Sequence, residues 1–552
     1  MAKRKVNSDF DFEKVLLVLS LVRILSIYMI QTSFVPDEYW QSLEIAHKMV
    51  FGYGYTTWEW VHGIRSFFYP LWFAGAYKFI EIFGLDSRKT VIYLPRYMQA
   101  IFSAYADTCV ASWFRFMLGP TYKSLSSWVS LLWMMCLFVS YCSTRTLSNT
   151  IELNFTIIAL YLYPWSLLEK KEKTKSLLVE SKMKSRTYLW FVGLACLSRP
   201  TSAIIWLPLC FYDIAVNSKP FLLLTKVYLI IFLKVFVSTI LIDTFFYKKI
   251  VITPLNFFLY NFSYNIGIHY GAHSFFWYVT VGIPVVLGPL VLPFYQEIYS
   301  ITFSILSYLF SKYWNHQKTL MKLSNIDLIL YFTVMWTLFC YSLVPHKEFR
   351  FILPLAPIMF YISALHFKKY GGKNITCFIR NSKYVLVLSL LMLLSNFIGS
   401  FYLGQWHQIG PLDTISILAE EASSNSNKSS FLFLMPCHST PLYSHLHVNV
   451  TTKFLTCEPN FQRDPVYKDE ADLFFEYPSG WLHKNYPKID DCSLPSHIIM
   501  FSNLKIWIDD FLSRYRYTLW KSVFHAHFTQ GKQSENIEIY KLNWTKPIHC
   551  FP

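Results

Sequence analysis

The sequence has few charged residues. Only 15% of its 552 residues are Asp, Glu, Lys or Arg, whereas soluble globular domains carry about 25%. Hydrophobic residues make up 54% of the chain, aromatic residues make up 19%, and the mean hydropathy is +0.32. This composition excludes a disordered chain, a collagen and a coiled coil, and it predicts a protein that folds largely in lipid.

Acidic residues are the scarcer charged type, because 34 Asp and Glu stand against 50 Lys and Arg, which leaves a net charge of +16. In a soluble chain this excess would suggest nucleic acid binding. Here the basic residues concentrate in short loops between apolar runs, which is typical of the cytosolic loops of polytopic membrane proteins. We therefore predict contact with membrane lipid and no nucleic acid partner.

Cofactor-binding motifs are also missing. The sequence has no Walker loop, no Rossmann fingerprint and no nucleophile elbow. His438, His445 and His447 lie near Cys437, but their spacing matches no standard zinc pattern, and the spaced carboxylates of magnesium or calcium loops are missing. We therefore predict no metal and no cofactor.

Long apolar runs fill the chain up to residue 404. The first, near residues 15–30, contains Arg23, and we predict an uncleaved signal anchor because no small-residue cleavage site follows it. Further runs lie near residues 67–84, 91–118, 125–142, 150–168, 187–213, 221–246, 277–310, 326–344, 351–367 and 382–404. Most reach the roughly 20 residues that a spanning helix needs, so we predict a mainly α polytopic membrane protein with about 10–13 membrane helices. The polar remainder predicts two domains, a transmembrane domain over 1–404 and a mixed α/β C-terminal domain over 405–552.

Basic loops predict the orientation of the chain. The N-terminus and the loops near 312–322 and 368–373 are basic and should be cytosolic, which places the first loop, the HKEFRF segment and the C-terminal domain in the lumen. The basic stretch 170–186 should also be cytosolic, yet five apolar runs precede it. One of these five is then re-entrant or interfacial, and the sequence does not identify which.

Cysteines support a lumenal C-terminal domain, because Cys437, Cys457, Cys492 and Cys550 all fall there. In an oxidising compartment they could form two disulfides, although four cysteines allow three pairings. The alternative is four free buried thiols. The domain also carries N-glycosylation sequons at Asn427, Asn449 and Asn543.

The first predicted lumenal segment, SFVPDEYWQSLEIAHKMV, begins a helix. Pro36 suits the first helical position, and Asp37 and Glu38 fall in the first turn, where the helix dipole favours negative charge. Apolar residues at helical spacing then predict a short amphipathic helix on the membrane surface: Tyr39, Trp40, Leu43, Ala46 and Val50. The two carboxylates either cap this helix or act in catalysis, since they lie where a membrane helix meets the lumen.

A second dense cluster is HKEFRF, residues 346–351, between two apolar runs. His346, Lys347 and Arg350 could hold a phosphate, Arg350 through a bidentate fork. The alternative is a charged interfacial turn in which Glu348 balances Lys347.

Other ionisable residues lie within or at the ends of apolar runs, where a lone charge costs about 2.5–3.5 kcal/mol. Arg145 in STRTLSN and Arg199 in LSRPT lie near polar breaks and are the better candidates for ligand binding. We predict helix-to-helix pairing for Asp107, Glu152 and Asp243, with partners that the sequence does not assign.

Several segments resemble a known family: TSFVPDEYWQSLEIAH, YGYTTWEW, STRTLSNTIE, SRPT, HKEFRF, MPCHSTPLYSHLH and DEADLFFEYPSGWL. From about Arg23 to His527 the chain resembles the glycosylphosphatidylinositol (GPI) mannosyltransferase III family, the phosphatidylinositol-glycan class B proteins. Its PDE and HKEFRF segments are also similar to the lumenal mannosyltransferases of N-glycan assembly, whereas MPCHSTP and DEAD resemble the GPI family alone. The insertion near 169–186 and the tail after about Glu535 match poorly.

The resemblance implies a GT-C glycosyltransferase of the endoplasmic reticulum membrane with a lumenal active site. It implies an inverting α-1,2-mannosyltransferase that transfers the third mannose from dolichyl-phosphate mannose to the GPI precursor. The acidic base of the family's first lumenal loop corresponds to Asp37, with Glu38 as the adjacent matched acid. We predict that the donor phosphate is held by His346, Lys347, Arg350, Arg199 and Arg145. Protein partners are not identified.

Two alternatives remain open at this point. One is an α-1,2-mannosyltransferase of dolichol-linked oligosaccharide assembly, which shares the PDE and HKEFRF segments. The other is a lipid or solute transporter, although the sequence shows no inverted repeat and its acidic motif lies in a loop.

Overall fold

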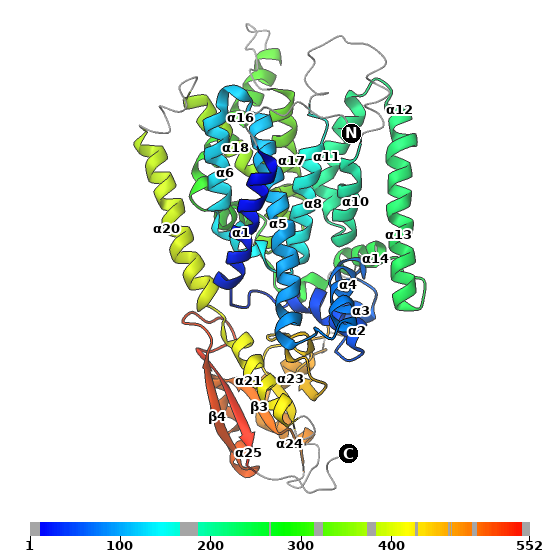
Figure 1. Cartoon of the computed structure of the whole chain (residues 1–552), viewed down its shortest axis with the longest axis vertical. Helices are drawn as coiled ribbons and strands as arrows, with labels where there is room; N and C mark the ends of the chain where they lie inside the picture. The colour runs from blue at the N-terminus through cyan, green and yellow to red at the C-terminus, as the bar shows by residue number, and fades with distance from the viewer. Residues whose placement is uncertain are drawn as a thin grey trace.

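The computed structural model describes residues 11–543, except for 166–185, 264–265, 314–323, 372–381, 426–428, 462–463, 465 and 488–493. A bundle of helices forms the larger part of the molecule. A smaller sheet with flanking helices lies at one end of this bundle, and we call it the C-terminal α/β region (residues 410–542; Figure 1). The predicted mainly α fold with a mixed α/β C-terminal part is confirmed.

The bundle is built from the apolar runs. Its helices are α1 (Phe12–Met29), α5 (Arg88–Leu118), α6 (Lys123–Met134), α7 (Leu137–Ser143), α8 (Ser148–Leu162), α10 (Tyr188–Ser198), α11 (Ser202–Val216), α12 (Pro220–Leu223), α13 (Leu229–Tyr247), α15 (Ile283–Leu287), α16 (Val291–Tyr313), α17 (Asn325–Ser342), α18 (Ala356–Gly371) and α20 (Lys383–Gln405). At the edges of the bundle, α13 and α20 expose large apolar side chains such as Leu241 (65%) and Phe397 (75%). Such surfaces indicate lipid contact.

Five helical spans in the described part of the chain are long and apolar enough to cross a membrane, or six if α6 and α7 count together. The five are Pro220–Tyr247, Tyr278–Phe310, Asn325–Ser342, Phe349–Tyr370 and Lys383–Ser424. The helices α6 and α7 are bent by 60° relative to one another. The remaining bundle helices are shorter or carry charges, so the predicted total of about 10–13 stays a prediction.

Charges inside the bundle are paired between helices. Arg23 Nε lies 2.7 Å from Asp107 Oδ2, and both side chains are buried. Likewise, Arg199 Nε lies 3.1 Å from Glu152 Oε2. These contacts confirm the predicted helix-to-helix pairing of Asp107 and Glu152. Asp243 instead accepts hydrogen bonds from hydroxyl and backbone groups, among them Thr253 Oγ1 at 2.7 Å.

The first loop folds into short helices beneath the bundle: η1 (Tyr39–Leu43), α2 (Glu44–Phe51), α3 (Trp58–Val61) and α4 (Phe68–Ile82). Figure 1 shows α2, α3 and α4 together next to the C-terminal α/β region, whereas α5 extends to the opposite end of the bundle. The apolar run that forms α4 therefore lies with the first-loop helices, and the runs that form α6 and α7 make a bent pair. Which of the five runs before 170–186 is re-entrant or interfacial stays a prediction, and residues 170–185 of the basic stretch lie outside the described residues.

The apolar face of η1 and α2 contacts protein. Trp40, Leu43 and Ala46 are buried in one cluster with Phe431 and Leu442 of the C-terminal α/β region. The prediction that this face lies on the membrane surface was wrong, because helical periodicity reveals an apolar face but not what covers it. Further short segments complete this end of the bundle: α14 (Thr253–Phe258), η5 (Leu259–Ser263), η6 (Ile266–Tyr270), η7 (Tyr278–Gly282) and η9 (Phe349–Leu355).

The C-terminal sheet has the strand order β2-β1-β3-β5-β4. Its strands are β1 (Ser430–Leu434), β2 (Thr451–Phe454), β3 (His497–Phe501), β4 (Tyr517–Phe524) and β5 (Asn536–Leu542). The first three in space are parallel, and β5 is antiparallel to both neighbours. The helices that accompany it are α21 (Gly410–Ser424), α22 (Tyr443–Leu446), α23 (Glu470–Glu476), α24 (Pro478–Asn485) and α25 (Lys505–Arg514).

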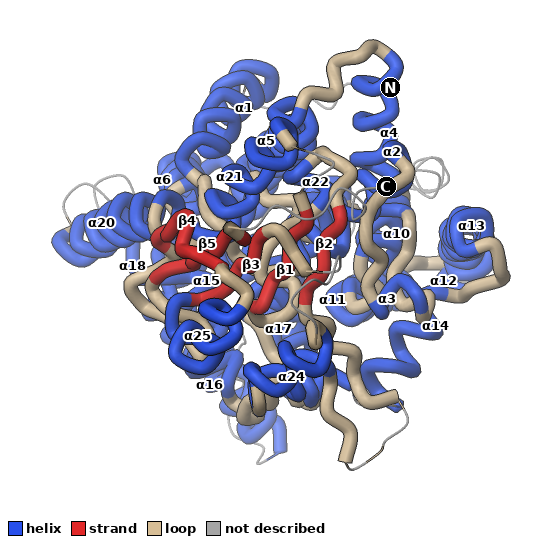
Figure 2. The backbone as a smooth tube through the Cα atoms, turned by 90° about the horizontal axis from the view of Figure 1, so that it is seen from below, coloured by secondary structure: helices blue, strands red, loops and turns tan. Residues whose placement is uncertain are grey.

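Both faces of the central strands are covered. Phe431 and Phe433 pack with α21 on one face, whereas Leu432 and Leu434 pack with α25 on the other (Figure 2). This arrangement explains why β1 is continuously apolar, as is typical of buried strands in parallel sheets. Since α20 ends at Gln405, the whole sheet follows the predicted boundary at residue 404.

Cys437 and Cys457 form a disulfide. The sequence left this pairing open among three possibilities, and Cys492 and Cys550 lie outside the described residues. Asn449 and Asn543 of the predicted sequons are exposed, and Asn427 is also outside the described residues.

Candidate active site

A cavity of about 390 Å³ lies where the bundle, the first loop and the C-terminal α/β region meet. The first loop contributes residues from Val35 to Arg65, and the HKEFRF segment contributes His346, Glu348 and Arg350. Further walls come from the α10–α11 junction, from α14 to η7, and from the disulfide loop of the C-terminal α/β region. Segments far apart in the sequence thus share one chamber of a size suited to a small ligand.

Asp37 faces this cavity and is held by an arginine. Its Oδ2 lies 2.7 Å from Arg350 Nη2, and its side chain is 28% exposed. A turn starts at Pro36, whose carbonyl accepts hydrogen bonds from Tyr39 and Trp40. Proline fixes φ near a helical value, so it sets the direction in which the following acid projects. The structure therefore brings together the two predicted groups that the catalytic hypothesis needs most.

Glu38, the neighbouring acid, points into the protein. Its Oε2 lies 2.8 Å from Arg145 Nη1, and both side chains are at most 5% exposed. Arg145 also donates to the backbone carbonyl of Thr32 at 2.7 Å and stacks 4.1 Å over the ring of Tyr141. Adjacent residues on a helix differ by about 100° in direction, which explains why Asp37 and Glu38 have different surroundings. Glu38 and Arg145 lie outside the cavity lining and fix the segment that carries Asp37.

The HKEFRF segment presents two of its three basic side chains, His346 and Arg350, to the cavity. Arg350 donates to both oxygens of Glu348 at 2.7 Å, and His346 Nε2 lies 3.1 Å from Glu348 Oε1. Lys347 turns the other way, since its Nζ donates to the carbonyls of Val344 and His273, and it lies outside the lining. The buried Nη1 of Arg350 has no hydrogen-bond partner among the described residues, so it is available to an anionic ligand.

Glu348 forms its ion pair with Arg350, and not with Lys347 as the interfacial-turn alternative assumed. Burial would raise the pKa of Glu348, but the Arg350 guanidinium and the hydrogen bond from His346 hold this pKa well below its usual range. Glu348 therefore remains a carboxylate at neutral pH and holds Arg350 in place beside Asp37.

Arg199 supplies a third basic side chain to the cavity, after Arg350 and His346, from the end of α10. Its guanidinium pairs with Glu152, donates to Ser148 Oγ at 3.1 Å, and lies 5.2 Å from the centre of the Phe351 ring. The structure thus brings Asp37, Arg350, His346 and Arg199 together.

Sequence reasoning assigned no role to other polar residues that line the cavity. Arg65 donates twice to Glu59 Oε1, at 2.7 and 3.1 Å, and Gln41 Nε2 donates to Glu59 Oε2 at 3.3 Å. Thr57 also lines the wall. The YGYTTWEW segment that contains Thr57 and Glu59 carries part of the family resemblance, but no spacing rule marks these residues as a site.

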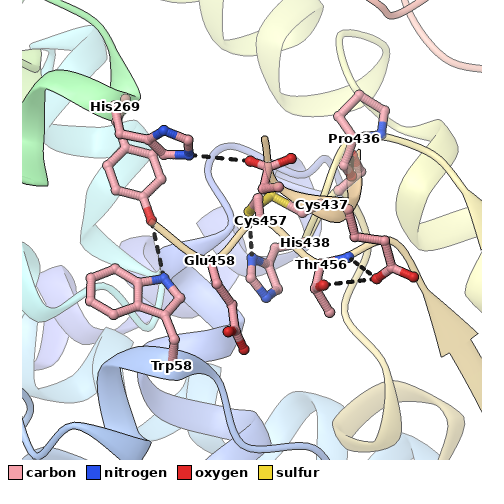
Figure 3. The surroundings of a disulfide bond; sticks show 12 residues. Trp58, His269, Pro436, Cys437, His438, Thr456, Cys457 and Glu458 are labelled. Atoms are coloured by element: carbon pink, nitrogen blue, oxygen red, sulfur yellow. Dashed lines mark hydrogen bonds and ion pairs between the residues drawn. A yellow bond between two sulfur atoms is a disulfide. The ribbon is translucent and has the colours of Figure 1, made fainter. Parts of the chain in front are cut away.

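The disulfide loop forms one side of the cavity, since Cys437, His438 and Cys457 all line it. Figure 3 shows these three residues close together. The His438 ring packs edge-on against Trp40 with centroids 4.6 Å apart. Burial lowers the pKa of His438 to about 4, so this imidazole is neutral at physiological pH. These three residues also lie within 4.8 Å of one another. The two sulfurs are bonded to each other, however, and a disulfide does not provide the thiolates that bind metals.

The whole fold is similar to that of a membrane glycosyltransferase. The crystal structure of ArnT from Cupriavidus metallidurans bound to undecaprenyl phosphate superposes with a TM-score of 0.58 at 13% identity, over 96% of this chain and 97% of that one. At this identity the likeness shows the fold alone, and the fold is that of the GT-C membrane glycosyltransferases.

Sequence comparison identifies the family of glycosyltransferases to which the chain belongs. A model of the Alg9-like mannosyltransferase family matches residues 14–447, and the chain belongs to this family of glycosyltransferases. It is 39% identical to GPI mannosyltransferase 3 of Drosophila melanogaster, over 94% of this chain and 85% of the relative. It is 37% identical to GPI alpha-1,2-mannosyltransferase 3 of Homo sapiens, over 97% of this chain and 88% of the relative.

Proposed function

We propose that this mannosyltransferase transfers the third mannose, in α-1,2 linkage, from dolichyl-phosphate mannose to a GPI precursor that carries two mannoses. The names of its relatives and the extent of the similarity support the choice of acceptor. The observation that carries the mechanism is the contact between Asp37 and Arg350 inside the cavity. This contact supports a mechanism in which the carboxylate meets the acceptor hydroxyl and the guanidinium meets the donor phosphate.

Asp37 acts as the general base. It accepts the proton of the acceptor hydroxyl while that oxygen attacks the anomeric carbon and the bond from this carbon to the phosphate oxygen breaks. A single displacement inverts the configuration and needs no second, nucleophilic carboxylate. The partly exposed Asp37 side chain is accessible from the cavity, whereas the buried Glu38 is engaged by Arg145.

Arg350, Arg199 and His346 hold the leaving dolichyl phosphate. Arg350 keeps one unpartnered Nη1 within the described structure, and guanidinium groups bind phosphate strongly because they form paired, charge-assisted hydrogen bonds. Cations placed where negative charge develops stabilise the transition state. Because the phosphate leaves as an anion, a separate general acid is not required.

We assign positioning roles to Glu38, Arg145 and Lys347. The first two fix the turn that carries Asp37, and Lys347 joins the HKEFRF segment to the backbone near His273. The sequence prediction that Arg145 and Lys347 bind the phosphate directly is therefore not part of this mechanism, since neither side chain lines the cavity.

We place the protein in the endoplasmic reticulum membrane, with the transmembrane domain at 1–404 and the cavity and the C-terminal domain (405–552) in the lumen. The disulfide between Cys437 and Cys457 supports an oxidising compartment for this end of the molecule. Lys368 and Lys369 in the last turn of α18 support a cytosolic position for the opposite end.

The decisive experiment deletes the gene in cells and identifies the lipid intermediate that accumulates. A GPI precursor with two mannoses is expected, together with its conversion to a three-mannose species when the wild-type protein is restored. Accumulation of a truncated dolichol-linked oligosaccharide would favour the N-glycan alternative. Uptake of a solute by proteoliposomes without sugar transfer would favour a transporter, a class that the family membership argues against.

A further inference from the structure

Two buried polar atoms on the first-loop wall of the cavity have no partner in the described part of the structure: Thr57 Oγ1 and Gln41 Oε1. Their residues are only 4% and 5% exposed, and both line the cavity. A buried hydroxyl or amide oxygen without a hydrogen bond costs about 1–3 kcal/mol. Such atoms are rare in folded proteins and indicate groups that a ligand or a bound water satisfies.

The backbone conformation of Thr57 suits a helix cap, so it matters that its hydroxyl makes no capping hydrogen bond. Thr57 is the N-cap residue of α3 and has an extended backbone, with φ −70° and ψ 163°. A threonine here normally accepts a hydrogen bond from the first turn of its helix. Thr57 makes no such capping bond. Its hydroxyl is therefore not used for the local fold and remains free for the cavity.

The groups beside these atoms form a wall without net charge. Glu59 accepts from Gln41 Nε2 and from Arg65, so its carboxylate and the Arg65 guanidinium neutralise each other. The wall thus offers both donors and acceptors in one place. It differs from the proposed phosphate side of the cavity, where Arg350 Nη1 has no partner within the part of the chain that the structure describes.

Aromatic rings adjoin this polar wall. Trp58 and Trp40 both line the cavity, and the Trp58 indole donates to the Tyr270 hydroxyl at 3.1 Å (Figure 3). A sugar ring has hydroxyl groups around its edge and apolar C–H groups on its faces. A site with a few convergent polar groups and aromatic walls matches this chemistry.

We propose that Gln41, Thr57 and Glu59, with Trp58 beside them, form a pyranose subsite that holds the terminal mannose of the acceptor. This inference rests on the proposed function for the identity of the sugar. Gln41 follows Asp37 by four residues on the same helical segment, and both line the cavity. A ring whose hydroxyl reaches Asp37 therefore extends along Gln41 and Thr57. The donor mannose has the same ring chemistry, and the experiment distinguishes the two sources.

The test replaces Thr57 with valine, which has the same shape but no hydroxyl. Because Thr57 Oγ1 makes no hydrogen bond within the described structure, Thr57→Val should leave folding unchanged. We expect the KM for a two-mannose GPI acceptor to rise about three- to tenfold, with kcat and the KM for dolichyl-phosphate mannose within twofold of wild type. A rise in the donor KM alone, or no change in either KM, would overturn the acceptor assignment.

The matched control is Thr56→Val, the same change at the preceding residue. The Thr56 hydroxyl accepts from Lys48 Nζ at 2.6 Å, and Thr56 is not part of the lining. Both KM values should stay at the wild-type level in this variant. An equal rise in the acceptor KM for both variants would show a general effect on the loop and would contradict the subsite.

A binding experiment separates this proposal from the proposed transfer reaction. Saturation-transfer-difference NMR with methyl α-D-mannopyranoside should show contact with the wild-type protein in detergent and a weaker signal with Thr57→Val. Binding that is lost in this variant supports the subsite even if the wild-type protein transfers no mannose to a GPI acceptor. No binding, or equal binding to both proteins, would count against the subsite even if transfer is active.

Discussion

Glu38 and Glu44 belong to the same helical stretch, and both are buried, yet their carboxylates have different partners. Glu38 forms an ion pair with Arg145 at 2.8 Å. Glu44 is fully buried against the C-terminal α/β region, where its Oε1 accepts from the backbone amides of Leu442 and Ser444 and from the Ser444 hydroxyl. Burial raises the pKa of Glu44.

This difference separates two kinds of contact made by the first loop. Toward the active site it uses charges, with Asp37 and Glu38 each paired to an arginine. Toward the C-terminal α/β region, Glu44 and His47 make polar contacts without an arginine or lysine partner, such as the contact between His47 and His447 at 3.0 Å, and Asp86 Oδ2 lies 3.8 Å from His447 Nε2. The charged contacts hold Asp37 and its turn against the helix bundle, and the contacts of Glu44 and His47 hold one wall of the cavity against the C-terminal α/β region.

The largest effect is expected at Asp37. Asp37→Asn keeps the shape but cannot accept the proton of the acceptor hydroxyl, so mannosyl transfer in microsomes should fall by about a thousandfold or more. Protein level and thermal stability should remain close to wild type, because the side chain is partly exposed. Transfer near the wild-type rate would eliminate Asp37 as the base.

The comparison itself is tested by a matched pair of variants. Glu38→Gln leaves Arg145 buried without its counter-charge and should destabilise the protein by about 3–5 kcal/mol. Glu44→Gln should cost less than about 1 kcal/mol, because burial already favours the uncharged form and the amide oxygen still accepts. Thermal unfolding in detergent measures the stability of both variants. Equal destabilisation would contradict the distinction between the ion-paired Glu38 and the Glu44 contact that has no ion pair.

Acidification should weaken the contact with the C-terminal α/β region. Burial lowers the pKa of His47 and of His445 to about 3, below the value of about 6.5 in an unfolded chain. The unfolded state then binds protons first, so stability is lost as the pH falls below 6.5. The loss reaches at most about 2 kcal/mol per histidine at pH 5, and the raised pKa of Glu44 opposes it.

Unfolding temperatures at pH 7.5 and pH 5.0 measure this effect. His47→Gln, which cannot gain a proton, should show a smaller drop between the two values than the wild type. An unfolding temperature that is independent of pH in the wild-type protein would contradict the assignment of neutral, buried histidines to this contact.

A smaller effect is expected at Arg350. Arg350→Lys keeps the charge, but one ammonium cannot bridge Asp37 and Glu348 and also present a donor to the phosphate. Turnover should fall about tenfold while expression stays constant. Unchanged turnover would show that Arg350 has only a structural role, in which it holds Asp37 and Glu348 in place.

No effect is expected from chelators. The proposed displacement uses arginine and histidine side chains for the phosphate, so transfer should persist after exhaustive EDTA treatment. If EDTA abolished activity and added divalent metal restored it, the basic side chains of the cavity would need a metal ion to hold the phosphate.

The sequence predicted the broad fold because long apolar runs have few alternatives to membrane helices. It also pointed to Asp37, Arg350, His346 and Arg199, since each lies in a charged motif at the end of an apolar run. It did not predict which groups pair. Glu38 and Arg145 are 107 residues apart, and no local pattern records such a contact.

The sequence also did not predict the directions in which side chains point. Lys347 lies close to Arg350 in the chain, yet its Nζ bonds backbone carbonyls away from the cavity. Thr57 and Gln41 are neutral and common residue types, so their position on the cavity wall carries no sequence signal. Only the spatial arrangement shows that their oxygens lack partners among the described residues.

Two walls of the cavity come from segments about 400 residues apart in the chain. The Trp40 indole donates to the carbonyl of Thr440, which lies 400 residues later, and the Cys437–Cys457 loop lines the same chamber as Asp37. During synthesis, a nascent chain therefore carries its acid long before the opposing wall exists. The wall formed by Cys437, His438 and Cys457 is complete only after synthesis has passed residue 457, so a product that terminates earlier lacks this side of the cavity.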